Sequence, residues 1–417
     1  HLLSFDNHRA METEFFNTRV LFTESPAKGK KVHDALADAF VRTVDDYLPG
    51  KGSVVTFTGG FDGRTIVSCS LHLGKEFKTL AFGKAEDEDV HIPYNNAKEL
   101  GLEFIHLESS DPLYITHKYS EDSIAITKAS GGFNGFLYPH FLYIARESAK
   151  HGNCLVTGCG GSELFRAAHN AGAVVSQALY DVLTIEGEAE LKNALLASPK
   201  IKILQKEVIE NVIGGFMDDL MKYRKALNTF GTTNRKLYYF MHNETLRKLF
   251  GIWIYNQAKY INVRSPFLDY RFIEAVYRSD LAGAYNAFFT HNPIKRFKGQ
   301  WLYSVIIGKT NRKIFNQKTG KGYPPKHILT LAGRLKLVIP FFKRRLIRRV
   351  AHEDIDNLGI LSGLNYFINN TNVNYDLPWF DEKEILNLIK QSQNVINEVD
   401  RDILLQYFSI HSIFDTK

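Results

Sequence analysis

The sequence predicts an α/β protein built on a parallel sheet, with extensive helical additions. In the first half of the chain, short apolar runs alternate with stretches whose apolar residues recur at helical spacing. Such alternation is typical of parallel strands joined by right-handed helical crossovers. The short runs are apolar throughout, which indicates strands that are covered on both faces. From about residue 165 onward the pattern is overwhelmingly helical, so we expect helices to follow the sheet and wrap it.

The individual elements are expected in a regular order along the chain. Strands are predicted at 53–58, 77–82, 102–107 and 154–158. Helices are predicted at 32–48, from 62 to about 73, over about 88–100 and at 139–151. Glycine or proline follows three of these helices, at Pro49-Gly50, Gly101 and Gly152. Longer amphipathic stretches at 176–230, 236–260 and 380–413 predict the helical additions.

Charge and composition indicate an ordinary globular protein. Hydrophobic residues make up 44% of the chain, and the formal net charge is +7. Much of the basic excess lies in residues 334–349, which hold seven basic residues and no acid. We interpret this segment as a solvated helix face over an apolar underside, with a membrane-surface or nucleic-acid patch as the alternative. The sequence contains no run of transmembrane length and no signal peptide, so we expect a cytoplasmic protein.

Cysteine and histidine patterns predict neither a disulfide framework nor a metal centre. The three cysteines, Cys69, Cys154 and Cys159, show no C-x-x-C spacing, so reduced thiols are expected. The 15 histidines lack an H-E-x-x-H pairing, and we expect them to be surface or core residues.

Two glycine-rich segments follow predicted strands, T-G-G-F-D-G-R at 58–64 and T-G-C-G-G-S-E-L-F at 157–165. In α/β sheets, ligands bind beyond the carboxyl ends of the strands, where glycines let backbone N–H groups approach an anion. These segments therefore predict a phosphate site, although tight turns that need positive φ are the alternative for each. Neither is a Walker A loop, and Glu163 stands where a dinucleotide fingerprint would have its third glycine after Gly158 and Gly160.

These residues carry a resemblance to a known family. Residues 58–64 are similar to the S-G-G-x-D-S signature of the PP-loop ATP pyrophosphatases, and 157–165 resemble the G-E-G-x-D-E-L-F segment of the asparagine synthetase branch. V-R-S-P-F-L-D-Y-R at 263–271 and K-T-G-K-G-Y-P-P at 318–325 resemble two further segments of that branch. The resemblance covers roughly residues 35–330 and implies an adenine nucleotide α-hydrolase-like domain.

The resemblance also implies a reaction. A substrate carboxylate attacks the α-phosphorus of ATP in the presence of Mg²⁺, pyrophosphate leaves, and an amine or ammonia converts the acyl-adenylate into an amide and AMP. The expected partners are a small-molecule or peptide carboxylate and an amine donor. A nucleic-acid partner is not expected.

Domain boundaries follow from the same resemblance. Glutaminases of this family need a cysteine at the mature amino terminus, whereas the first residue here is His1 and the first cysteine is Cys69. We therefore expect a separate glutaminase or an N-terminal domain as a further partner. Residues 1–34 are interpreted as the tail of an amidotransferase-like domain or a linker, 35–330 as the synthetase domain, and 331–417 as a helical extension packed on it.

The nucleotide site implied by the resemblance can be assigned residue by residue. Residues Thr58, Gly59 and Gly60 form the phosphate loop, and Asp62 provides the magnesium-binding carboxylate. Gly63 departs from the signature by losing the second serine hydroxyl. The remaining nucleotide-binding candidates are Phe82 and Gly83 beside adenine and Gly158 and Gly160 in the second loop.

The catalytic lysine is expected to be Lys321 or Lys318. Lys321 is favoured because it directly precedes the glycine-aromatic pair, and a surface lysine is the alternative for either.

The second loop departs most from the family. Cys159 replaces a glutamate proposed as a base for the amine, and Ser162 replaces the second magnesium-binding aspartate, whereas Glu163 is retained as a catalytic candidate. A hydroxyl in place of a carboxylate weakens a magnesium site. In the 263–271 segment, Arg264 and Asp269 are interpreted as structural residues of the loop that closes the pocket.

Three functions fit these features. The leading hypothesis is an ATP-dependent amide-forming ligase. A PP-loop sulfur-transfer enzyme acting on RNA is the second, although the P-F-L-D segment argues against it. A degenerate family member with weak or no turnover is the third, because of Cys159 and Ser162.

Overall fold

The structure is a computed structural model of the chain. It describes residues 2–6, 9–13, 17–165, 176–285, 297–337, 358–371, 377–392 and 398–414.

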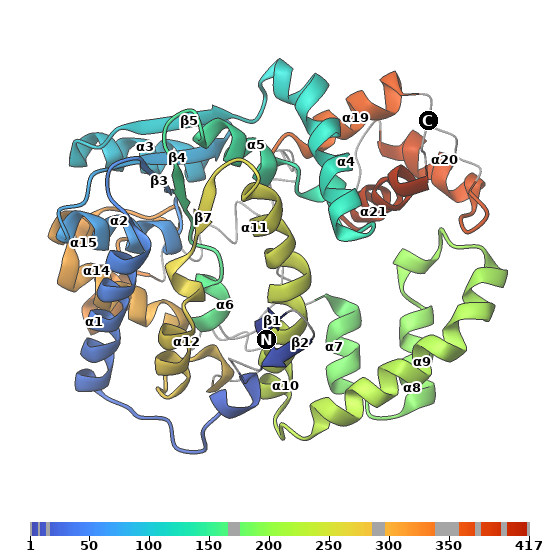
Figure 1. Ribbon diagram of the computed structural model, residues 1–417, viewed down its shortest axis with the longest axis horizontal. Coiled ribbons are helices and arrows are strands. Elements are labelled where there is room, and N and C mark those ends of the chain that lie inside the picture. Colours follow the sequence, from blue (N-terminus) through green and yellow to red (C-terminus); the bar gives the residue numbers. More distant parts are fainter. Residues whose placement is uncertain are drawn as a thin grey trace.

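The fold is built on a parallel sheet of five strands, in the order β5-β4-β3-β6-β7 (Figure 1). The strands are β3 (Ser53–Thr56), β4 (Phe77–Gly83), β5 (Phe104–Glu108), β6 (Cys154–Val156) and β7 (Asn262–Arg264). The first four confirm the predicted strands. The fifth lies in a part of the chain whose pattern was overwhelmingly helical, so that expectation was wrong here. With three residues, β7 is too short to show a periodicity of its own and is defined by its pairing with β6.

Helices cover one face of the sheet through a core that includes Val55 and Val156. These helices are α1 (Lys30–Tyr47), α2 (Asp62–His72), α14 (Trp301–Thr310) and α15 (Arg312–Asn316). Side chains alternate along a strand, so the neighbouring residues Val54 and Leu155 point to the opposite face. There they join the core of α4 (Tyr119–Ser130), α5 (His140–Ser148) and the C-terminal helices α19 (Ile360–Asn370), α20 (Glu382–Ser392) and α21 (Glu398–Phe414). Coverage of both faces confirms the prediction from the apolar strands.

The predicted crossover helices are confirmed, including α3 (Glu88–Leu100), which ends at Gly101 in the left-handed conformation. The stretch predicted as helical at 176–230 is divided into α7 (Gln177–Thr184), α8 (Glu188–Leu196) and α9 (Lys206–Asn228). Gly187 lies at the first break, and Pro199 starts the short 3-10 helix η4 (Pro199–Ile201) at the second. The stretch at 236–260 runs through α10 (Thr233–Phe240), the π-helix η5 (Met241–Phe250) and α11 (Gly251–Gln257).

Shorter elements connect these parts. They are η2 (Tyr114–Lys118), η3 (Gly135–Leu137), α6 (Gly161–Phe165), η6 (Pro266–Leu268), α12 (Tyr270–Tyr277), η7 (Gly283–Tyr285), η8 (Phe297–Gln300), α16 (Lys326–Leu329) and α17 (Leu331–Lys336).

The N-terminal segment contains a hairpin of β1 (Leu2–Phe5) and β2 (Ala10–Thr13), followed by the 3-10 helix η1 (Thr18–Leu21). Leu21 is buried in the same core as α1, and Ala27 pairs with Ser279 in an isolated bridge. Residues around 21–27 therefore pack on the sheet domain.

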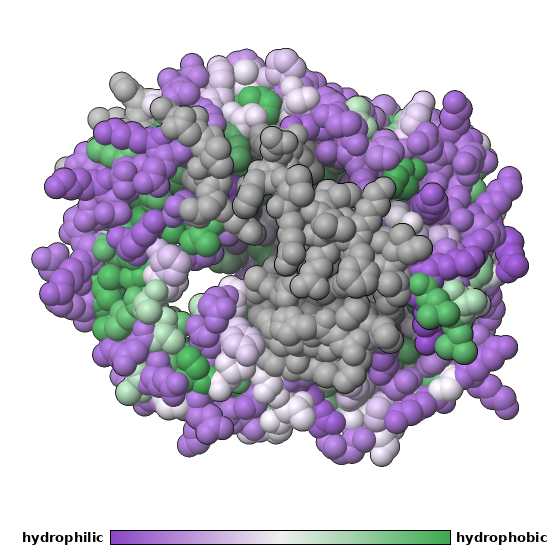
Figure 2. Space-filling model, turned by 180° about the vertical axis from the view of Figure 1, so that it is seen from behind, coloured by the Kyte–Doolittle hydropathy of each residue, from purple (hydrophilic) through white to green (hydrophobic). Residues whose placement is uncertain are grey.

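Polar side chains dominate much of the described surface on the face shown in Figure 2, with hydrophobic residues in small groups. Of the basic segment 334–349, only 334–337 fall within the described residues. None of the helices in the described part of the chain is long and apolar enough to cross a membrane. The whole arrangement is a Rossmann-like α/β domain, consistent with a nucleotide α-hydrolase-like fold that carries helical additions.

Candidate functional site

A cavity of about 1060 Å³ opens at the carboxyl edge of the sheet. Strand β3 pairs with β4 on one side and with β6 on the other, so the chain reverses its winding direction between β3 and β6. Such a switch point is the usual ligand site of an open α/β sheet. Three segments far apart in the sequence line the cavity here: Thr58–Gly60, Thr157–Cys159 and Gly320–Lys321.

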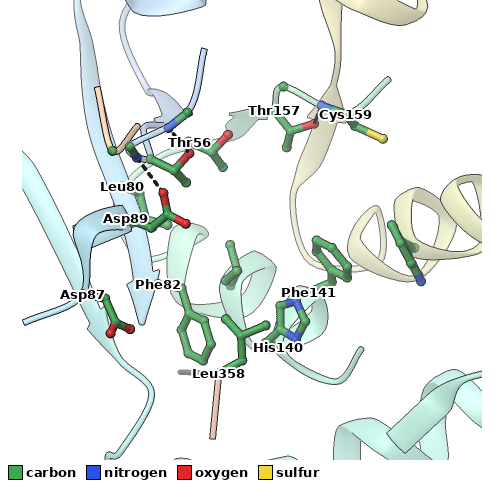
Figure 3. A pocket seen from close by; sticks show the side chains of 18 of the residues that line it. Thr56, Leu80, Phe82, Asp87, Asp89, His140, Phe141, Thr157, Cys159 and Leu358 are labelled. Atoms are coloured by element: carbon green, nitrogen blue, oxygen red, sulfur yellow. Dashed lines mark hydrogen bonds between the residues drawn. The ribbon is translucent and has the colours of Figure 1, made fainter. Parts of the chain in front are cut away.

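The loop after β3 is held from two sides. Gly59 N–H donates to Asp89 Oδ1 at 3.0 Å, and Gly320 N–H donates to Gly59 O at 2.8 Å. A Cβ atom on Gly59 would lie 2.8 Å from Asp89 Oδ1 and 3.1 Å from Gly320 Cα. No larger residue fits without a shift of one of these neighbours. In this structure the Gly59 N–H is therefore bound to the Asp89 carboxylate (Figure 3), and the Gly60 N–H donates to Thr58 Oγ1 at 3.3 Å.

A buried cation lies behind the same loop. Arg64 in α2 is fully buried, and its guanidinium donates to Gly60 O at 3.4 Å and to Lys318 O at 3.2 Å. Burial lowers the pKa of Arg64 to about 10, so the side chain remains charged at neutral pH. Arg64 thus joins the loop at 58–60 to the 318–321 loop and adds positive charge beneath it.

Asp62, the predicted magnesium ligand, begins α2 behind the cavity lining. Tyr303 Oη donates to one of its carboxylate oxygens, and Ser162 Oγ donates to the other at 2.9 Å. Ser162 therefore lies beside Asp62, where the resemblance implies a second aspartate. No group of three or more metal-ligating side chains occurs within the described ranges. Mg²⁺ is usually held by one or two carboxylates together with substrate phosphates. Asp62 would hold an ion that arrives with the nucleotide only by exchanging its two hydroxyl donors for the ion.

Gly63 lacks a side chain for a steric reason. A Cβ atom at this position would lie 2.2 Å from Thr56 O at the end of β3. A residue with a side chain at this position would therefore require the backbone at the end of β3 to shift.

The structure brings half of the predicted site residues to the cavity wall. The candidates that line it are Thr58, Gly59, Gly60, Phe82, Gly158 and Lys321. Six others are absent from the lining: Asp62, Gly63, Gly83, Gly160, Glu163 and Lys318.

The two lysine candidates are separated. Lys321 lines the cavity, and its Nζ lies 5.5 Å from the centre of the Phe61 ring. Lys318 instead lines a separate surface pocket beside α3 and α15. Of the two, only Lys321 faces the cavity that contains the phosphate loop.

Cys159 lines the cavity at the end of the second loop. Burial raises the pKa of its thiol well above the usual range, and the negative charges of Glu163 and Asp62 raise it further. The side chain is therefore a neutral thiol, unsuited to act as a base or a persulfide carrier.

Residues that the sequence analysis missed line the far side of the cavity. His140 stacks on Phe82 with ring centres 5.8 Å apart and an interplanar angle of 9°. Burial lowers the pKa of His140 to about 4, and its Nδ1 atom has no hydrogen-bond partner within the described part of the chain. Phe141, Phe250 and Trp253 continue this side. In the sequence these are ordinary apolar residues of helices, so no pattern distinguished them from the core.

Arg264 and Asp269 make structural contacts, as predicted, but no residue of the 263–271 segment is among those that line the cavity. Arg264 donates to Tyr47 O at 3.3 Å, and Asp269 caps α12 by accepting from the N–H groups of Arg271 and Phe272. Phe267 is fully buried and packs on Phe40, with ring centres 4.5 Å apart.

In comparisons with known proteins, no family model and no curated protein matches the chain.

Proposed function

We propose that the protein is an ATP-dependent amide-forming ligase that resembles asparagine synthetases. It adenylates a substrate carboxylate, releases pyrophosphate, and lets an amine or ammonia attack the acyl-adenylate. The observation that carries this proposal is the convergence of Thr58–Gly60, Gly158 and Lys321 on one cavity at the switch point of the sheet. Chemistry at a phosphate needs backbone donors and a cation around the group that gains charge. Lys321 provides the cation, and the Gly59 and Gly60 N–H groups would exchange Asp89 and Thr58 Oγ1 for phosphate oxygens.

Each residue has a part in the proposed reaction. The carboxylate oxygen bonds to the α-phosphorus as the bond to pyrophosphate breaks, and the loop at Gly59 and Gly60 holds the leaving group. Lys321 stabilises the charge that develops in both steps, while buried Arg64 keeps the two loops together. Asp62 is the residue that would hold magnesium, which neutralises the phosphate charge. In the second step the amine nitrogen bonds to the acyl carbon, AMP leaves, and the amine loses a proton to solvent.

A nucleotide-binding protein without turnover is the second candidate. Two features favour it: Ser162 stands in place of a carboxylate, and both oxygens of Asp62 already accept hydroxyl hydrogen bonds. The sulfur-transfer alternative loses support, because the raised pKa of Cys159 disfavours the thiolate that this chemistry requires.

Calorimetric titration with α,β-methylene-ATP, with and without Mg²⁺, tests the proposal. The matched variant is Asp62→Asn, which keeps the shape and one of the two acceptor oxygens but removes the charge. We expect Mg²⁺-dependent binding that Asp62→Asn weakens by about ten-fold, since one charged ligand of the ion is lost. An affinity for α,β-methylene-ATP that changes neither with Mg²⁺ nor with Asp62→Asn would contradict the proposed site.

Turnover separates the ligase from the second candidate. Pyrophosphate release from ATP is measured with a panel of carboxylic acids, with hydroxylamine as the trapping amine. A hydroxamate product identifies the ligase. Tight nucleotide binding without release on any acid would favour the non-catalytic function.

A further inference from the structure

Aromatic side chains form one side of the cavity. The rings of Phe141 and Trp253 stack with centres 4.4 Å apart and an interplanar angle of 25°, and the Phe250 ring lies 4.9 Å from that of Trp253. All three side chains line the cavity, and we refer to them as the aromatic wall. They come from α5, η5 and α11, so helices fix their positions.

Cys159 extends this wall toward the phosphate loop. Its side chain packs against the cluster of Leu249, Phe250 and Trp253. The asparagine synthetase resemblance implies a glutamate at this position, so the chain carries a small neutral residue where a charge was expected. With Cys159 in place of that glutamate, the second loop meets the aromatic wall through a neutral apolar contact.

The charged residues of the cavity lie elsewhere. Asp87 and Asp89 are on the opposite side from Phe141 and Cys159 (Figure 3), within the acidic run Glu86–Asp89 that lines the cavity. Lys321 belongs to the loop that touches Gly59. Among the described lining residues, those from α5, η5 and α11 carry no charge, since His140 remains neutral at physiological pH.

The polar side chain next to the aromatic wall, Gln257, already uses its amide N–H in a hydrogen bond within the protein. Gln257 lies one turn after Trp253 in α11, and its Nε2 donates to Phe141 O at 3.0 Å. A charged group placed against this surface would be buried without a counter-charge, which is costly. A ligand group that fits here is therefore uncharged and apolar, and stacking on the rings favours a flat one.

We propose that the aromatic wall binds the acyl part of the carboxylate substrate, and that this part is an uncharged aromatic or similarly flat apolar group. The inference rests on the proposed function, because adenylation places the substrate beside the nucleotide. The volume of about 1060 Å³ lies at the upper end of the roughly 300–1000 Å³ typical of small-molecule pockets, which suits a nucleotide with an acyl group beside it. A short dicarboxylic amino acid such as aspartate would leave its second charge unpaired against the wall.

Calorimetry with 3-phenylpropionate and aspartate tests the inference on the full chain, with and without saturating α,β-methylene-ATP and Mg²⁺. We expect 3-phenylpropionate to bind at least about ten-fold more tightly than aspartate, because only its side chain is free of charge. Equal affinities, or a preference for aspartate, would overturn the inference.

Two variants of equal size isolate the role of Cys159. Cys159→Glu restores the charge that the family carries, and Cys159→Gln supplies the same volume without it. We expect Cys159→Glu to bind 3-phenylpropionate at least about ten-fold more weakly than Cys159→Gln. If the two variants bind it equally, the inference fails. The comparison of the two acids on the unmodified chain stays decisive if a variant does not fold.

The same titrations distinguish the two proposals. Nucleotide binding without a preference for 3-phenylpropionate would overturn the inference and leave the proposed function standing. Preferential binding of 3-phenylpropionate without nucleotide binding would overturn the proposed function and support the apolar carboxylate site. Binding of neither would overturn both.

Discussion

At the scale of single residues, close contacts around Gly59 restrict which residues the loop at 58–60 can accommodate. Gly59 lies between Asp89 and Gly320, and the two neighbouring glycines differ in how much space surrounds them. A Cβ atom on Gly60 would meet only Thr58 Oγ1, at 3.4 Å, which is an ordinary contact. The two positions therefore form a matched pair for testing the loop.

Alanine at Gly59 should damage nucleotide binding far more than alanine at Gly60. The Gly59→Ala methyl group would push against Asp89 and Gly320, so the loop must move away from its anchors. We expect about a ten-fold or greater loss of α,β-methylene-ATP affinity for Gly59→Ala and a much smaller loss for Gly60→Ala. Calorimetry on both variants checks this. Equal losses would mean that the close contacts at Gly59 do not set the loop geometry.

Two buried histidines should make the fold sensitive to acid. Burial lowers the pKa of His140 and of His242 to about 4, whereas an unfolded histidine titrates near 6.5. Between these values the unfolded chain binds more protons, so stability falls as the pH drops from about 6.5 to about 4. Each histidine should lower the free energy of unfolding by about 2 kcal/mol between pH 7 and pH 5.

His140→Phe provides the measurement for this acid sensitivity. Phenylalanine keeps a flat ring on Phe82 but cannot take up a proton. Urea unfolding of the chain and of His140→Phe at about pH 7 and about pH 5 should show a smaller loss for the variant, by about 2 kcal/mol. The same loss in both proteins would show that His140 does not titrate as its burial implies.

The residues of the site were predictable where a distinctive sequence pattern marks them. Glycines after strands and a lysine before a glycine-aromatic pair identified Gly59, Gly60, Gly158 and Lys321 as lining residues. The aromatic wall was not predictable, since Trp253 and Phe250 have the helical spacing of any core residue. Arg64 was also missed, because a basic residue in a helix gives no sign that it will be buried beneath a loop.

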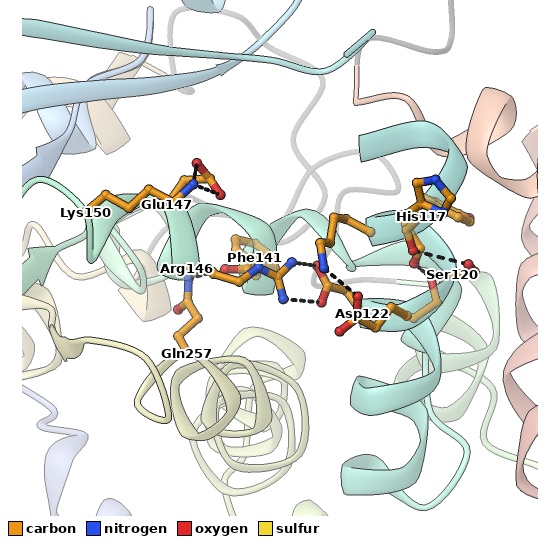
Figure 4. A network of polar contacts seen from close by, with 12 residues as sticks. His117, Ser120, Asp122, Phe141, Arg146, Glu147, Lys150 and Gln257 are labelled. Atoms are coloured by element: carbon orange, nitrogen blue, oxygen red, sulfur yellow. Dashed lines mark hydrogen bonds and ion pairs between the residues drawn. The ribbon is translucent and has the colours of Figure 1, made fainter. Parts of the chain in front are cut away.

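At the scale of elements, a buried ion pair joins α4 to α5 next to the cavity. Arg146 donates to both oxygens of Asp122, at 3.0 and 2.6 Å, and Asp122 is only 1% exposed (Figure 4). Burial raises the pKa of Asp122 to about 6, against the opposing effect of Arg146. The buried negative charge of Asp122 is therefore stabilised mainly by the Arg146 guanidinium.

Arg146→Met should destabilise the fold by about 3 kcal/mol or more, because it leaves the Asp122 charge buried without a partner. The double variant with Asp122→Asn should recover part of that loss, since the uncompensated charge is gone. Lys150→Met is the control, because Lys150, two residues after the end of α5, forms a surface ion pair with Glu147 of that helix (Figure 4). Its cost should stay below about 1 kcal/mol in chemical denaturation. A similar cost for both single variants would contradict the importance of the buried pair.

Elements with strong local signals were predicted, and those defined by pairing were not. Glycine or proline follows the sequences of α1, α3 and α5, so the predicted bounds of these helices came out within a few residues. Strand β7 is defined by its pairing with β6. Among the described residues, β1 and β2 pair with each other and with no other strand. Pairing of this kind is a tertiary property that a single run of residues does not reveal.

At the scale of the whole molecule, the chain returns to the sheet at its C-terminal end. Leu404 and Phe408 of α21 belong to the same core cluster as Val54 and Leu155 of the central strands. The last helix therefore completes the cover over one face of the sheet. The N-terminal hairpin differs, because the residues of β2 are exposed along its whole length.

Deletion of residues 398–417 should thus abolish the cooperative unfolding of the chain, whereas deletion of residues 1–13 should be tolerated. Without α21, apolar side chains of the sheet face and of α4 and α19 would be open to water. The stabilisation lost in this way should exceed the free energy of unfolding of a typical domain, which is about 5–15 kcal/mol. Thermal unfolding followed by near-ultraviolet circular dichroism separates the two truncations. A cooperative transition retained after loss of α21, with nucleotide binding intact, would show that the sheet and its switch-point cavity form a unit that is stable without its C-terminal cover.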